Sequence, residues 1–206
     1  MLAALGGAAS ARELAPLTAD VPEAAGLIER LRQGGLVLFF RHGDTRGMPC
    51  DRVFAVGRRE GQRNLSPDGR GQAARIGRRM AELGIPIALP VLAGPVYRAR
   101  DTAELAFGAE RVRVIAGLTA DDFAGAQLQA VLAEHRRLTS EPVAPGVNRV
   151  LIGHRTPAIM VLGPAVGGRA LPEGGAIVLA PRPEGAPEIL GIVEFAPLPG
   201  GGFHAC

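Results

Sequence analysis

Three short apolar runs, each followed by polar residues, are the feature that most constrains the fold of this chain. Leu36–Phe40 is apolar throughout, which is typical of a strand buried on both faces in a parallel sheet. Val91–Ala93 and Val150–Ile152 are shorter runs of the same kind, and segments with helical periodicity, such as Tyr97–Phe107, lie between the runs. This alternation predicts an α/β fold, a three-layer α/β/α sandwich with a mostly parallel central sheet.

The start of one helix is marked by consecutive residues. Ser66 is the expected N-cap, Pro67 suits the first helical position, and Asp68 places a negative charge in the first turn. Ala73 and Ile76 begin its expected buried face. The same patterns predict helices over 21–33 and 127–138, and strands over 112–115, 176–179 and 189–195.

Length and composition limit the class of protein. A chain of 206 residues with 47% hydrophobic and 21% charged residues fits one globular domain. No apolar run approaches the ~18 residues that a membrane span needs, so we expect no membrane insertion. Two cysteines, and no histidine pair with ligand spacing, lead us to expect no metal and no cofactor. A disulfide between Cys50 and Cys206 is left open.

The N-terminal segment, residues 1–20, has two interpretations. Ala9–Ala11 has the small-x-small form of a signal-peptidase site after a short apolar stretch, which would make the protein periplasmic or secreted. A flexible Ala/Gly-rich terminus on a cytoplasmic protein is the other interpretation. In both, we expect the folded domain to comprise residues 21–206.

The charge pattern points to an anionic partner. All 23 basic residues are arginine, whose planar fork grips phosphate or carboxylate in two places. The chain has no block of five basic residues, and only 4% of its residues are aromatic, so nucleic-acid binding is not expected. A small phosphorylated substrate fits better. The sequence does not indicate an oligomeric state.

Residues suited to phosphoryl transfer follow the three apolar runs. Arg41 and His42 come directly after the first, Arg98 follows the second, and His154 follows the third. The carboxyl ends of parallel strands share one edge of a sheet, so these side chains are expected in one crevice. Two guanidinium groups can hold the phosphoryl oxygens while His42 attacks through a neutral ring nitrogen. Its other nitrogen would then donate to a backbone carbonyl near Gly43.

The sequence resembles the histidine phosphatase superfamily, with the phosphoglycerate-mutase-like fold. The resemblance covers roughly residues 36 to 180 and is carried by four motifs in the family's order. These are Arg41–Thr45, Asn64–Ala73, Arg98 with Thr102–Glu104, and Gly153–His154.

The resemblance implies a role for each matching position. His42 would be the phosphorylated nucleophile, and the enzyme would be a phosphatase of the histidine acid type, similar to small, often exported bacterial phosphatases. The phosphate pocket would comprise Arg41, Arg98 and His154, with Thr45 and Asn64 assisting.

Two positions depart from the family pattern. Gly94 stands where the family usually has serine. The carboxylate that protonates the leaving group lacks its usual surrounding motif, and Asp121 is the predicted acid, ahead of Asp122 and Asp44. A phosphoglycerate-mutase-like phosphotransferase and a non-catalytic module that binds a phosphorylated ligand therefore remain alternatives.

Overall fold

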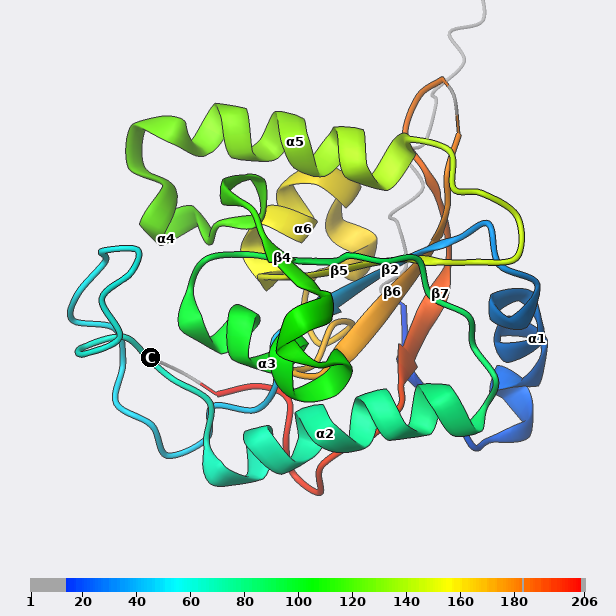
Figure 1. Cartoon of the computed structure of the whole chain (residues 1–206), viewed down its shortest axis with the longest axis horizontal. Helices are drawn as coiled ribbons and strands as arrows, with labels where there is room; N and C mark the ends of the chain where they lie inside the picture. Colours follow the sequence, from blue (N-terminus) through cyan, green and yellow to red (C-terminus); the bar gives the residue numbers. More distant parts are fainter. Residues whose placement is uncertain (1–13, 183, 205–206) are drawn as a thin grey trace, which may run out of the picture.

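The computed structural model describes residues 14–182 and 184–204, and these form one seven-stranded sheet between two layers of helices (Figure 1). The order across the sheet is β1-β7-β6-β2-β5-β3-β4. The strands are β1 (Leu17–Thr18), β2 (Val37–Arg41), β3 (Val91–Ala93), β4 (Val112–Val114), β5 (Arg149–Gly153), β6 (Gly175–Ala180) and β7 (Glu188–Glu194).

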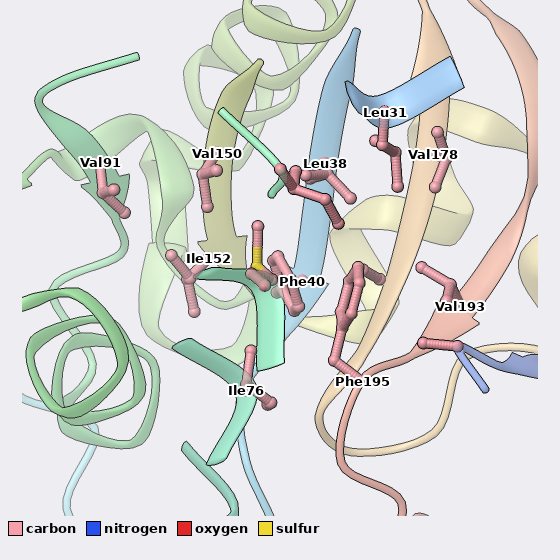
Figure 2. Close-up of a cluster of buried hydrophobic side chains, with 14 of the residues drawn as sticks. Leu31, Leu38, Phe40, Ile76, Val91, Val150, Ile152, Val178, Val193 and Phe195 are labelled. Carbon is pink, nitrogen blue, oxygen red and sulfur yellow. The ribbon is translucent and has the colours of Figure 1, made fainter. Parts of the chain in front are cut away.

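The helices divide between the two faces of the sheet. They are α1 (Ala25–Gln33), α2 (Pro67–Glu82), α3 (Tyr97–Phe107), α4 (Asp121–Ala124), α5 (Leu128–Ser140) and α6 (Arg155–Leu162). Leu38 and Phe40 of β2 pack in a cluster with residues of α1, α2 and α3 (Figure 2). Val37 and Phe39 point the other way and pack with residues of α5 and α6. The predicted three-layer α/β/α fold is confirmed.

Strand direction decides which chain ends meet. β2, β5, β3 and β4 are mutually parallel neighbours, so their carboxyl ends lie at one edge. β6 is antiparallel to both β2 and β7, which brings its amino end to that same edge. The sheet is therefore mostly parallel, as predicted, with β6 as the exception.

The cap of α2 is the one expected from sequence. The Ser66 hydroxyl accepts a hydrogen bond from the Gly69 N–H at 2.9 Å and donates to Asp44 at 2.7 Å. Pro67 is the first helical residue. The cap therefore ties the start of α2 to the loop that follows β2.

The N-terminal part of the fold extends further than predicted. Leu17–Thr18 pairs in parallel with β7, so the described residues before position 21 belong to the domain. The small-x-small motif at Ala9–Ala11 and Cys206 lie outside the described residues. Export and the Cys50–Cys206 disulfide therefore stay open, as the sequence left them. Along 14–182 and 184–204, no helix has the length and apolar character needed to cross a bilayer.

Candidate active site

A cavity of about 240 Å³ opens where the carboxyl ends of β2 and β5 meet the start of α3. It contains the side chains that the sequence placed in one crevice. Its lining residues are Arg41, His42, Asp51, Arg63, Arg98, Ala120, Asp121, Asp122, His154, Arg155, Thr156 and Glu173.

His42 is held in one tautomer by its own backbone. Its Nδ1 lies 2.9 Å from the carbonyl oxygen of Gly43, and a carbonyl can only accept, so Nδ1 carries the proton. Nε2 is therefore left with its lone pair, as expected from the sequence. Burial, followed by the charges of Arg98 and Arg41, holds the pKa of His42 well below its usual value. The imidazole is neutral at physiological pH and suited to act as a nucleophile.

His154 faces His42 from the end of β5. The two ring centroids are 5.4 Å apart. The Nε2 of His154 is buried and has no hydrogen-bond partner among the described residues. Burial and the charge of Arg98 hold the pKa of His154 well below its usual value too. A buried polar atom with no partner is costly, and an anion in the cavity would satisfy it.

The guanidinium of Arg41 is held in place by hydrogen bonds to two backbone carbonyls and one carboxylate. Its Nη1 donates to the carbonyl oxygens of Leu171, at 3.2 Å, and Gly202, at 2.9 Å. Its Nη2 donates to Glu173 at 3.2 Å, while Nε is buried without a partner among the described residues. Of five N–H donors, Nε–H and one on Nη2 therefore remain for a ligand. Burial lowers the pKa of Arg41 to about 10, so the group is still cationic at neutral pH.

Arg98 is held by a carboxylate on the loop after β2. Its Nη1 lies 3.0 and 3.2 Å from the two carboxylate oxygens of Asp51. The helix that carries Arg98 is joined to the loop after β2, because the Thr102 hydroxyl donates to the Arg98 carbonyl and accepts from the Gly43 N–H. Burial lowers the pKa of Arg98, and the nearby Asp51 opposes that effect.

Two predicted phosphate ligands do not reach the cavity. The Thr45 hydroxyl donates to Glu173 at 2.7 Å, and its backbone N–H donates to the same carboxylate at 3.0 Å. The Asn64 amide is used within its own loop, where it donates to the Gln62 carbonyl at 2.8 Å and accepts from Arg59 at 3.2 Å. The direct roles predicted for Thr45 and Asn64 are therefore corrected, because other partners occupy these side chains.

The predicted acid and its neighbour both line the cavity, from the first turn of α4. The pKa of Asp122 is raised, because partial burial and the adjacent Asp121 outweigh the opposite effect of Arg98. A carboxyl group with a raised pKa holds its proton at higher pH and is better suited to donate it. Asp122 therefore fits the role of acid better than Asp121, the reverse of the order expected from sequence.

The departure at Gly94 has a steric explanation. A Cβ built on Gly94 would lie 2.1 Å from the carbonyl oxygen of Leu118. The backbone of β3 thus passes directly against the turn that leads to α4. No side chain, serine included, fits at this position without moving that turn.

Three residues of the site were not anticipated as participants. Glu173 precedes β6 and reaches the cavity because that strand runs antiparallel to β2. Asp51 lies in a loop without periodicity. His204 lies beyond β7, and its Nε2 is 2.9 Å from Asp44 Oδ1 and 3.5 Å from Glu173. The directions of β6 and β7 bring Glu173 and His204 to this edge of the sheet. Sequence patterns do not reveal strand direction, so these two residues could not be predicted.

The group Asp44, Glu173 and His204 has ligand atoms within 4.8 Å of one another, a spacing that a metal ion can use. Both carboxylates already accept hydrogen bonds from protein donors. Asp44 accepts from Ser66 and from the Arg46 N–H, and Glu173 accepts from Arg41 and Thr45. The donor set matches a hydrogen-bond network behind Arg41, and the expectation of no metal stays a prediction.

The sequence profile of the histidine phosphatase superfamily (branch 1) matches residues 37–138, a stretch that contains His42 and Arg98. The resemblance to this superfamily is thereby confirmed over these residues. A search of curated proteins finds no match.

Two solved structures of phosphatases have the same fold. The protein histidine phosphatase SixA, complexed with tungstate, is 16% identical and superimposes with a TM-score of 0.51, covering 78% of this chain and 97% of SixA. A phosphoserine phosphatase from Entamoeba histolytica, in complex with phosphoserine, is 14% identical with a TM-score of 0.51, covering 76% of this chain and 95% of its own. These similarities concern the fold.

Proposed function

We propose that this protein is a phosphatase that hydrolyses a phosphomonoester through a phosphohistidine intermediate on His42. The observation that carries the proposal is the hydrogen bond from His42 Nδ1 to the Gly43 carbonyl, which leaves Nε2 as the only nucleophilic atom of the ring. The family match and the guanidinium groups around that ring support it.

The first step transfers the phosphoryl group to the enzyme. The Nε2 lone pair forms a bond to phosphorus as the bond from phosphorus to the ester oxygen breaks. The remaining donors of Arg41, the guanidinium of Arg98 and the Nε2 of His154 match the charge on the non-bridging oxygens. The buried Nε2 of His154 can donate to a phosphoryl oxygen only when it carries the proton. The neutral His154 is therefore in its Nε2–H tautomer in this mechanism.

The carboxyl pair of α4 supplies the proton for the leaving oxygen. Asp122, with its raised pKa, donates as that oxygen departs. In the second step a water molecule attacks the phosphohistidine, the resulting carboxylate takes a proton from the water, and inorganic phosphate is released. His42 then regains its lone pair, so no cofactor is consumed.

A substrate panel tests the proposal. The wild-type protein should release phosphate from p-nitrophenyl phosphate, and a reaction quenched with base should contain a base-stable, acid-labile phosphoryl group on His42. His42→Ala should show neither while keeping a folded circular dichroism spectrum. A folded His42→Ala variant with undiminished turnover would reject the mechanism.

The panel must also extend to other substrate classes. The two similar structures are a protein histidine phosphatase and a phosphoserine phosphatase, so phosphohistidine and phosphoserine belong in the panel. The narrower class of histidine acid phosphatases rests on the sequence resemblance alone, whereas the family match is to branch 1.

A further inference from the structure

A second hollow, an apolar groove of about 430 Å³, is lined by residues of α4, the helix that also lines the catalytic cavity. Its walls come from α4, α5, the turn before α4, and the loop between β2 and α2. Most of the lining is apolar, including Val56, Ala116, Phe123, Ala124 and Val131. A groove with such walls binds hydrocarbon in preference to water.

The groove and the cavity share a thin wall. Asp121 and Asp122 line the catalytic cavity, whereas the next two residues of the same helical turn, Phe123 and Ala124, line the groove. The centre of the Phe123 ring is 5.7 Å from the Arg98 guanidinium carbon. The Phe123 ring therefore lies between the Arg98 guanidinium and the apolar groove. A substrate phosphate held by Arg98 would be close to the groove.

The loop after β2 extends the apolar surface. Phe54 and Val56 are each 53% exposed, and the Phe54 ring meets the edge of the Phe123 ring at a centroid distance of 5.3 Å. The loop is held by its own hydrogen bonds, among them those from Gln62 to the Ala55 carbonyl and from the Val53 N–H to the Gly61 carbonyl. Large apolar side chains kept in solvent by an ordered loop, beside an apolar groove, mark a ligand surface.

We propose that this groove binds the apolar part of the substrate, and that the substrate is an amphiphilic phosphomonoester whose alcohol carries an alkyl or aryl group. The proposal rests on the proposed phosphatase function and names its substrate class. The phosphate enters the arginine-lined cavity, and the hydrocarbon passes Phe123 to lie between Val56 and Val131. Phe54, Val56 and Phe123 thereby become specificity-determining residues.

A chain-length series tests the proposal. With n-alkyl phosphates used below their micelle-forming concentrations, kcat/KM should rise with each added methylene, by up to roughly fourfold per group, and then level off when the groove is filled. The matching n-alkylphosphonates, which are not hydrolysed, should show the same trend in Kd by calorimetry. A kcat/KM and a Kd that do not depend on chain length would overturn the proposal.

Surface variants locate the effect. The double variant Phe54→Ser with Val56→Ser changes two exposed side chains and should lower kcat/KM for the long-chain esters at least tenfold, with methyl phosphate unaffected. Leu89→Ser and Met160→Ser remove exposed apolar side chains elsewhere and should leave the chain-length trend unchanged. Equal losses for methyl and long-chain esters, or no loss at all, would count against the groove.

The two proposals fail in distinguishable ways. If no phosphomonoester is hydrolysed, the proposed function fails, while the phosphonate series still measures whether the groove binds hydrocarbon. If esters are hydrolysed without a chain-length effect, only the groove proposal fails. A preference for phosphopeptides over every alkyl and aryl phosphate would likewise overturn the amphiphile as substrate.

Discussion

The imidazole of His204 lies 2.9 Å from a carboxylate oxygen of Asp44, a residue 160 positions earlier in the chain. Its Nε2 is also 3.5 Å from Glu173, the carboxylate that holds Arg41. Burial acts to raise the pKa of Asp44, but hydrogen bonds from Ser66 and His204 outweigh it, and the pKa is lowered. The segment after β7 is therefore part of the support behind Arg41.

Removing this contact should weaken both the fold and substrate binding. His204→Ala leaves a buried acceptor without its partner, so we expect the free energy of unfolding to fall by about 1–3 kcal/mol. KM for a phosphate ester should rise more than kcat falls, since Arg41 loses part of its support. Urea denaturation and steady-state kinetics measure the two effects. His204→Asn, which keeps a donor, should recover part of both; equal stability of His204→Ala and wild type would refute the role.

Thr45 should behave as a structural residue. Thr45→Val removes the hydroxyl bonded to Glu173 and should lower the free energy of unfolding by about 1 kcal/mol. The Kd for inorganic phosphate, measured by calorimetry, should stay close to the wild-type value. Arg41→Lys is the comparison, because lysine lacks the planar fork, and phosphate binding should weaken strongly. A Thr45→Val variant with phosphate binding as weak as that of Arg41→Lys would restore the direct role.

The leaving group distinguishes the acid from its neighbour. Asp122→Asn should reduce kcat for an alkyl phosphate by about 10²–10⁴-fold, because an alkoxide leaves poorly without a proton. The loss should be much smaller for p-nitrophenyl phosphate, whose leaving group needs little protonation. Asp121→Asn serves as the matched control, with a smaller and leaving-group-independent effect. If Asp121→Asn shows the leaving-group dependence instead, the acid is Asp121.

Stability should fall as the solution is acidified. The pKa values of His42, His154 and His135 are lowered in the folded protein, chiefly by burial, from an ordinary value of 6.5. Below about pH 6.5 the unfolded chain takes up protons that the folded protein does not, so the free energy of unfolding decreases, by up to about 1.4 kcal/mol per pH unit for each histidine.

Urea denaturation between pH 7.5 and pH 5 measures this slope. His154→Gln should reduce the slope by the contribution of one histidine. A stability that is flat across this range in the wild-type protein would show that these imidazoles take up protons while folded.

The part of the site nearest to the parallel strands was predictable. The apolar runs identify β2, β3 and β5, and the polar residues after them, Arg41, His42, Arg98 and His154, line one cavity. The partner of His42 Nδ1 was also predictable in outline, because a backbone carbonyl near Gly43 was expected and the Gly43 carbonyl is the acceptor. Contacts of this kind join residues that are close together along the chain, so they do not depend on how distant segments pack.

Helix α6 and strand β1 were missed for local reasons. Within α6, the apolar residues run without a break from Pro157 to Leu162, so they show no helical period, although only Ala158, Ile159 and Leu162 pack with the core that contains Val37 and Phe39. β1 has two residues, too few for any periodicity, and exists because it pairs with β7.

What the sequence determined by itself is the fold class, the cap of α2 and the four side chains that follow parallel strands, because each depends on residues close together along the chain. The tertiary structure alone decided that Glu173 and His204 support Arg41, that Thr45 and Asn64 are turned away from the cavity, and that the pKa of Asp122 is raised. These follow from the antiparallel direction of β6 and from the burial and charges that surround each group, which are properties of segments brought together from distant parts of the chain.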